Sequence, residues 1–219
     1  MDSKPVSSTV RCLLSDAKEA YDHDDGDDTI LETIHTRLEK GKCISRWEDF
    51  RAILRWKAGR EREDFEGPQS EKKYLHWDKR QFPHLSEDTK NAFGLASEFL
   101  CNGQNADARL IESIKILDRF SGVNVRMATA ILTFFNPREF TVMDYRAWKA
   151  LVHIRWAGPT GPFEFWFEKS ADYLPYLARC KELSRALGWK LRETDHALWK
   201  LEDIMKVREQ REAQARSQR

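Results

Sequence analysis

The chain contains 219 residues, with 37 Lys and Arg against 36 Asp and Glu, so its formal net charge at pH 7 is +1. This balance excludes a strongly basic, tail-like nucleic-acid binder and an acidic solvating chain, and eight Trp and twelve Phe are too many for a disordered protein. The length suits one large domain or two small lobes that share a core. Because the sequence has no long uncharged apolar run and no secretory leader pattern, we expect a cytoplasmic protein without a membrane partner.

Apolar residues recur at helical spacing along most of the chain, and capping residues mark helix ends. We expect a polar, partly flexible lead-in over 1–28, a helical body over 29–207 and a polar tail over 208–219. Gly and Pro interrupt the pattern over 60–85, which predicts a long loop. Helices are predicted over 29–40, 45–59, 86–101, 106–120, 127–135, 142–152 and 163–187, and from about Thr194. No stretch alternates β-branched residues as a strand would, so the predicted fold class is all-α.

The most informative stretch runs from Phe120 to Ala150, where a tight turn over 121–124 joins two predicted helices. Such a hairpin presents backbone N–H groups at a helix amino terminus, where hydrogen bonds and the helix macrodipole favour a phosphate. Gly122 adopts a positive φ without steric cost, and Asn124 is the best non-glycine residue for a second left-handed position. A grip of this kind needs no side-chain charge and is therefore compatible with the low net charge.

This layout resembles the helix-hairpin-helix DNA glycosylase superfamily. Its members carry a hydrophobic-x-Gly-hydrophobic-Gly hairpin followed by x-x-Thr-Ala, and an essential aspartate heads a later helix after a hydrophobic lead. The matching residues are Gly122, Val123, Ala128 and Asp144, with Lys149 at a position often held by arginine. The resemblance implies a two-lobed helical fold with a cleft between the lobes and a helix-hairpin-helix motif over about 106–136.

Three residues depart from the family pattern. Asn124 replaces the second hairpin glycine, and Met127 replaces the family threonine. Arg126 stands where lyase-active members carry their Schiff-base lysine, and arginine stays protonated and cannot act as an amine nucleophile. The resemblance therefore implies a monofunctional enzyme that hydrolyses the N-glycosidic bond and leaves an abasic site. The widely spaced cysteines also set the chain apart from the iron–sulfur branch.

Asp144 is the candidate catalytic residue. Hydrolysis of a nucleoside passes through an oxocarbenium-like sugar cation, which a nearby carboxylate stabilises, and the same carboxylate can orient or deprotonate the attacking water. The alternative is that Asp144 only caps the helix that follows it. The candidate DNA contacts are Gly122, Val123, Asn124, Val125 and Arg126 of the hairpin, supported by Arg146 and Lys149.

The target base has to leave the stack and enter a pocket, and aromatic residues suit such a pocket. The candidates are Trp56, Lys57 and Tyr145, although Trp56 equally fits a core position. The residues Tyr74, His76 and Trp77 of the predicted long loop are candidates for a wedge in the duplex.

Double-stranded DNA is the implied partner, and we expect a monomer. No residue spacing indicates a metal site, and the resemblance implies no organic cofactor but allows a monovalent cation at the hairpin carbonyls. The sequence does not identify the excised base, which could be damaged or modified. If it is a modified base of phage DNA, the protein would be a defence enzyme. Two rival hypotheses remain: a non-catalytic helix-hairpin-helix DNA-binding module, and a helical interaction protein in which the hairpin is only a turn.

Overall fold

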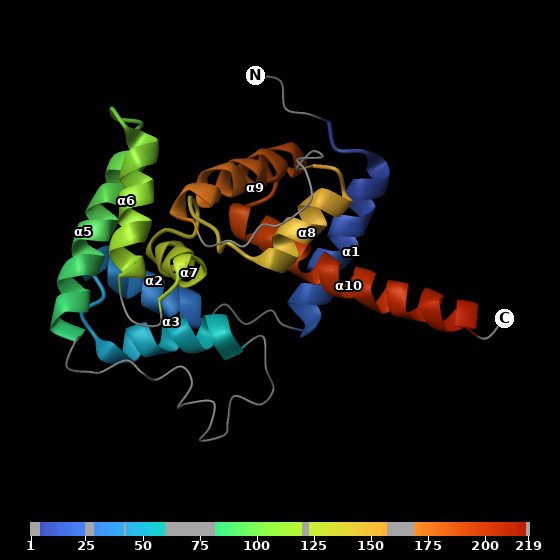
Figure 1. The fold of residues 1–219 in the computed structure, drawn as a ribbon, viewed down its shortest axis with the longest axis horizontal. Helices are drawn as coiled ribbons and strands as arrows, with labels where there is room; N and C mark the ends of the chain where they lie inside the picture. Colours follow the sequence, from blue (N-terminus) through green and yellow to red (C-terminus); the bar gives the residue numbers. More distant parts are fainter. Residues whose placement is uncertain are drawn as a thin grey trace. The chain divides into compact units, whose positions relative to one another are not determined.

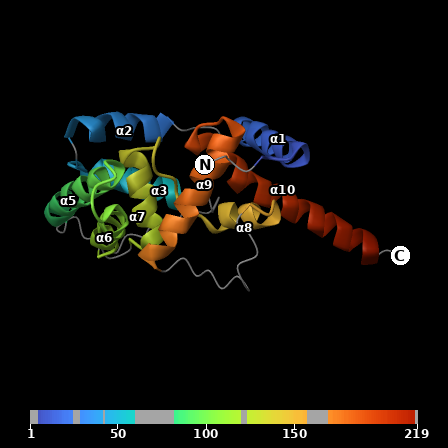
Figure 2. The ribbon, with the colours of Figure 1, turned by 90° about the horizontal axis from the view of Figure 1, so that it is seen from above.

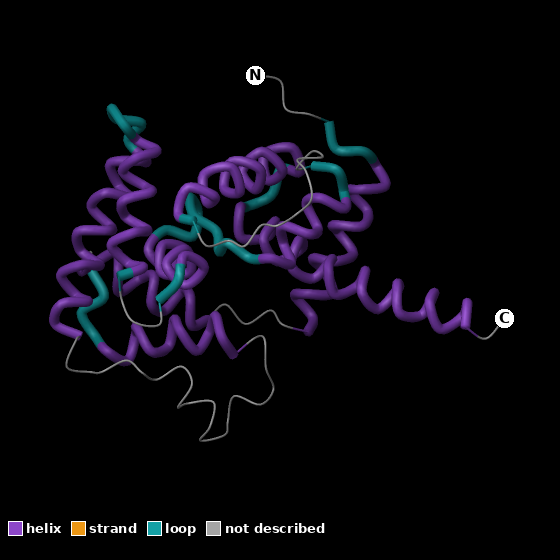
Figure 3. Tube along the Cα trace, viewed as in Figure 1, coloured by secondary structure: helices purple, strands orange, loops and turns teal. Residues whose placement is uncertain are grey.

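A computed structural model of the chain describes residues 5–24, 29–41, 43–59, 82–119, 123–156 and 169–217. These ranges are helical and contain no strand, so the predicted all-α class is confirmed for them (Figure 1 and Figure 3). None of the described helices is both long and apolar enough to cross a membrane. The chain divides into two compact units: unit 1 is Met1–Asp27, Met143–Phe165 and Pro175–Arg219, and unit 2 is Asp28–Val142 and Trp166–Leu174.

Unit 2 is built around one buried helix, α7 (Val125–Phe135). Its sequence is almost entirely apolar, and such a helix needs neighbours on all sides. In Figure 1 the helices of unit 2 surround α7, which packs against each of the four others. These are α2 (Thr29–Gly41), α3 (Trp47–Gly59), α5 (Phe82–Leu100) and α6 (Ala106–Asp118), and a short 3-10 turn, η3 (Ser170–Asp172), contacts α6.

Unit 1 is organised by its last helix, α10 (Leu191–Ser217), which packs against α1 (Ser8–Asp24) and α8 (Tyr145–His153). Both Figure 1 and Figure 2 show α10 running beside these two helices. The ring of Tyr21 on α1 stacks on His196 of α10 with 3.8 Å between centroids. The remaining helix is α9 (Tyr173–Leu187), and Arg11 of α1 donates to the carbonyls at its end.

Both chain ends contain more helix than the sequence predicted. The lead-in predicted over 1–28 contains α1, because Leu14, Ala17 and Tyr21 recur at spacings of three and four and are buried. The predicted tail over 208–219 is helical as far as Ser217, although the side chains over 206–216 are exposed. Arg208 pairs with Glu212 one turn later, at 3.1 Å, so polar residues support this helix from its own surface.

Several helix boundaries differ from those predicted. Helix α5 begins at Phe82, because Pro83 is tolerated in a first turn, where its missing N–H has no intrahelical partner. Helix α10 begins at Leu191 rather than Thr194, with Glu193 accepting from the N–H of Lys190 at 2.8 Å. The predicted helix over 142–152 starts only at Tyr145. Most of the predicted loop, and the first part of the helix predicted over 163–187, lie outside the described residues.

Candidate functional site

Asp144 is the N-cap of α8 in unit 1. Its backbone is extended, with φ −127° and ψ 135°, and one carboxylate oxygen accepts from the N–H of Arg146 at 2.8 Å. The residue is only 5% exposed. The partial positive charge of the helix start stabilises the ionised carboxylate at this position. A carboxylate held by a helix terminus and shielded from bulk water can act on a cationic transition state.

The surroundings of Asp144 include a buried phenol and thiol on α9. Burial raises the pKa of Tyr176 well above its ordinary value, and the neighbouring Cys180 thiol and the carboxylates of Asp195 and Asp144 add to the shift. Burial also raises the pKa of the Cys180 thiol, which keeps it neutral. The ring of Trp148 on α8 lies 6.2 Å from that of Tyr176. Asp144 therefore shares unit 1 with a set of buried polar groups that hydrophobic spacing alone did not reveal.

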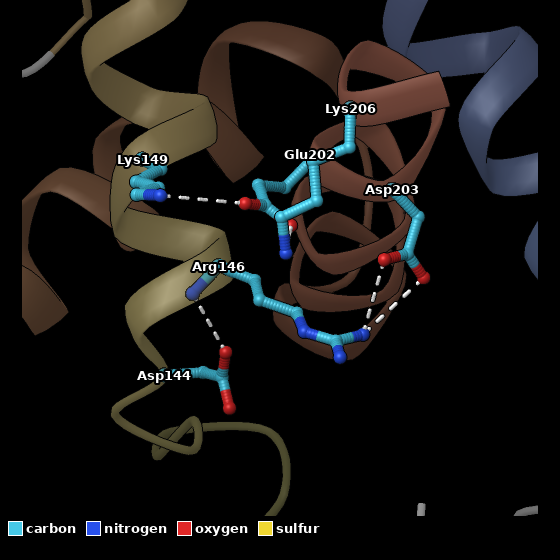
Figure 4. A network of polar contacts seen from close by, with 6 residues as sticks. All are labelled: Asp144, Arg146, Lys149, Glu202, Asp203 and Lys206. Carbon is cyan, nitrogen blue, oxygen red and sulfur yellow. Dashed lines mark hydrogen bonds and ion pairs between the residues drawn. The ribbon is translucent and has the colours of Figure 1, made fainter. Parts of the chain in front are cut away.

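The two basic residues predicted to support DNA contacts, Arg146 and Lys149, face α10 (Figure 4). One guanidinium nitrogen of Arg146 lies 3.2 Å from both carboxylate oxygens of Asp203, and the guanidinium stacks 4.7 Å from the ring centre of Trp199. Lys149 Nζ lies 3.6 Å from Glu202, and Lys206 approaches the other oxygen of Glu202 at 2.8 Å. Both cations are thus engaged within unit 1, which argues against their serving as primary phosphate contacts.

The amino terminus of α7 in unit 2 differs from the predicted hairpin geometry. Asn124 is not left-handed: its φ is −95° and its ψ 176°, and its side chain accepts from the N–H of Met127 at 3.0 Å. It is an N-cap, a position that requires extended backbone and favours Asn. Arg126 is exposed and Val123 and Val125 are buried, while Gly122 lies outside the described residues.

Two backbone N–H groups at the start of α7 have no described hydrogen-bond acceptor. Within the described part of the chain, neither the N–H of Val125 nor that of Arg126 donates a hydrogen bond. Such donors are the feature by which a helix amino terminus binds an anion. This helix start belongs to unit 2 and Asp144 to unit 1, so the helix-hairpin-helix motif and the cleft between lobes stay predictions.

The three base-pocket candidates have different surroundings. Trp56 is 8% exposed and packs edge-on against Phe134 in unit 2, with 5.0 Å between ring centroids, which supports the core alternative. Lys57 is partly buried on the same helix. Tyr145 is 42% exposed and directly follows Asp144, with Lys149 Nζ 4.6 Å from its ring centre. Of the three, Tyr145 alone is exposed. The wedge candidates Tyr74, His76 and Trp77 lie outside the described residues.

No cluster of three or more His, Cys, Asp or Glu side chains in the described ranges is arranged to hold a metal ion. Comparisons of the chain with models of known protein families, with curated proteins and with solved structures find no match.

Proposed function

We propose that this protein is a monofunctional DNA N-glycosylase that hydrolyses the bond between a flipped-out base and its deoxyribose. One observation carries the proposal: a 5% exposed carboxylate, Asp144, caps a helix and directly follows a buried, non-helical segment over 140–143. This is the local setting that the family resemblance requires of its essential aspartate. The all-α class is a further point in favour.

The chemistry follows from the setting of Asp144. Its carboxylate stabilises positive charge on the sugar as the base leaves, and it orients or deprotonates the water that attacks the sugar carbon. The proton of that water passes to the carboxylate, and the glycosidic bond breaks with its electrons going to the departing base. Arg126 provides no amine nucleophile, so water is the only acceptor of the sugar and an abasic site remains.

Substrate contacts are assigned to accessible groups. The exposed ring of Tyr145 stacks on the extruded base. The N–H groups of Val125 and Arg126 hold a backbone phosphate. Arg146 and Lys149, which pair with α10, act by fixing α8 and thereby the position of Asp144. The proposal therefore differs from the sequence prediction, in which Arg146 and Lys149 contact DNA.

The first test measures base release by mass spectrometry from genomic DNA of several sources, including phages. Duplexes with damaged or modified bases are then incubated with the protein and treated with hot alkali. Asp144→Asn is the decisive variant, because asparagine is as good an N-cap as aspartate but carries no charge. We expect its rate to fall about 10²- to 10⁴-fold with an unchanged melting temperature, while Arg126→Ala still forms alkali-labile sites.

The other outcomes overturn the proposal in distinct ways. Duplex binding without release of any base would make the protein a non-catalytic DNA-binding module. Absence of binding even at low salt, where phosphate contacts are strongest, would leave a helical interaction protein. Loss of activity in Arg126→Ala with a normal melting temperature would contradict hydrolysis that depends on Asp144 alone.

A further inference from the structure

Unit 2 contains a pocket of about 670 Å³ that the proposed function does not use. It is formed by α2, α5 and the end of α7, three helices that lie next to one another in Figure 1. Its volume is within the range of small-molecule binding sites. None of the residues that line it is a predicted DNA contact, a base-pocket candidate or the candidate catalytic carboxylate.

Two cations line the pocket without an acidic partner among the described residues. Lys90 and Arg138 are exposed at its rim, and neither forms an ion pair within the described ranges. Other basic residues of unit 2 do have acidic partners, as Arg109 has Glu98 at 3.1 Å and Arg37 has Asp49. No described Asp or Glu lines the pocket. The charge of the site therefore favours an anionic ligand.

The pocket also has a flat apolar wall. The rings of Phe93 and Phe135 are stacked, with 4.3 Å between centroids and 9° between planes, and Leu38 is buried beside them. Phe93 is buried, whereas Phe135 is partly exposed. A planar apolar group can extend this stack, because aromatic rings prefer offset-stacked neighbours.

Gly94 gives an independent indication that the space is kept open. It lies in the interior of α5, where glycine is the poorest residue after proline. A Cβ atom at this position would meet no heavy atom within 4 Å. The packing of the described chain therefore does not require a glycine here. Gly94 lines the pocket, so a larger side chain at this position would border the same open space.

We infer that this pocket binds a small organic anion in which a planar apolar ring carries a carboxylate or a phosphate. The ring lies against Phe135, and the anionic group lies between Lys90 and Arg138. The apolar wall accounts for the ring of the ligand, and the two cations account for its anionic group. A pocket with the wall alone would bind a neutral hydrocarbon equally well, and the exposed cations alone would form no pocket.

The test is isothermal titration calorimetry of the full chain with three probes: 1-naphthyl phosphate, 1-naphthoate and the neutral 1-naphthol. We expect at least one anion to bind at least tenfold more tightly than 1-naphthol, and the stronger of the two identifies the anionic group. Gly94→Leu and the double variant Lys90→Gln/Arg138→Gln should each weaken that binding at least tenfold. Circular dichroism verifies that both variants fold.

The matched control is Lys115→Gln/Arg109→Gln, which removes two exposed cations from the same unit outside the pocket. Its affinity for the anions should equal that of the parent chain. Equal binding of 1-naphthol and the two anions would overturn the inference, as would equal weakening in the control. Absence of binding of all three probes at millimolar concentration, or full binding by folded Gly94→Leu, would also contradict it.

Discussion

The two units bury different kinds of polar group. In the described part of unit 1 the buried polar residues include three carboxylates, Asp144, Asp195 and Glu202. In unit 2 they are mainly hydroxyls, and four of these donate to backbone carbonyls: Thr89 to Ser86, Ser113 to Ala92, Thr129 to Arg126 and Thr133 to Thr129. Asp49, which pairs with Arg37, is the one buried carboxylate among the described residues of unit 2.

This difference shows where each unit depends on particular partners. A buried hydroxyl that donates to a nearby carbonyl is satisfied at little cost. A buried carboxylate needs a cation or a helix amino terminus, and removing that partner leaves an uncompensated charge. Unit 1 should therefore be sensitive to the loss of charged partners, and unit 2 to the loss of apolar volume. The candidate catalytic carboxylate lies in the unit that already maintains buried charge.

The largest expected effect is a loss of volume in unit 2. Trp56→Ala should lower the free energy of unfolding by about 3–5 kcal/mol, because it removes a large side chain packed against the fully buried Phe134. Chemical denaturation measures the change. Trp47→Ala on the same helix serves as control, because Trp47 is only partly buried and should cost less. An equal cost for the two variants would contradict a core role of Trp56 and favour an accessible one.

The second effect tests the charges of unit 1. Glu202 is 3% exposed, whereas the side chains of Lys149 and Lys206 are 44% and 48% exposed. Replacing both lysines by methionine leaves the carboxylate buried without its cations, and we expect a cost of about 3 kcal/mol, at the lower end for buried pairs because the lysines are half exposed.

The reverse replacement should be milder. Glu202→Met keeps the volume, and the two released lysines can be hydrated, so we expect a loss of at most about 1 kcal/mol. Denaturant unfolding of the three chains gives the comparison. Similar costs in both directions would mean that unit 1 does not depend on the buried carboxylate in the way described.

The third effect concerns alkaline pH. Because burial raises the pKa values of Tyr176 and Cys180, the folded state keeps both groups neutral when the unfolded chain ionises them. Their contribution is complete below the ordinary pKa values, 9.0 for the thiol and 10.0 for the phenol, and is lost as the pH rises above them. The free energy of unfolding should fall by up to about 1.4 kcal/mol per pH unit for each group.

Two variants isolate this effect. Tyr176→Phe should lose less stability than the parent between pH 9 and pH 11, and Cys180→Ala should do so from a lower pH. Tyr145→Phe, at an exposed tyrosine, should follow the parent curve. Identical pH dependence in Tyr176→Phe and the parent would contradict the raised pKa of that phenol.

Local pattern predicted most of the helices but not those whose stability comes from elsewhere. The spacing over 29–40 matches α2, and the apolar run over 127–135 matches most of α7. Helix α1 was not predicted because its sequence is mostly polar, with few buried side chains such as Leu14 and Tyr21. Its helical structure depends on packing against α10. That contact joins opposite ends of the chain, so no short window of sequence contains it.

In the candidate site, too, local sequence predicted some features, and others depend on contacts between distant parts of the chain. The family resemblance implied that Asp144 heads a helix, and the structure has it as the N-cap of α8, although the helix predicted over 142–152 began two residues before it. Its neighbours were not predictable: Tyr176 comes from α9, and the partner of Arg146 is 57 residues further along the chain. A pattern that identifies a basic residue does not reveal whether another helix will neutralise it. The roles of Arg146 and Trp56 therefore needed the tertiary contacts.

The smallest effect separates two asparagines of unit 2 that cap helices in different ways. Asn124 is extended and its side chain accepts from Met127, whereas Asn105, before α6, has φ 60° and makes no side-chain cap bond. Asn124→Ala should cost about 1 kcal/mol, and Asn124→Ser should stay near the parent, because serine is an equivalent cap.

Substitution by glycine should change the melting temperature differently at the two positions. Asn124→Gly removes the cap bond and should lower the melting temperature slightly. Asn105→Gly removes no cap bond and relieves the steric cost of a left-handed residue, so it should raise the melting temperature or leave it unchanged. If Asn124→Gly stabilised the protein and Asn124→Ser destabilised it, the results would support the left-handed backbone that the sequence predicted for Asn124. The opposite signs at the two sites would establish that α7 begins with a side-chain cap, which leaves only its first two N–H groups for a phosphate.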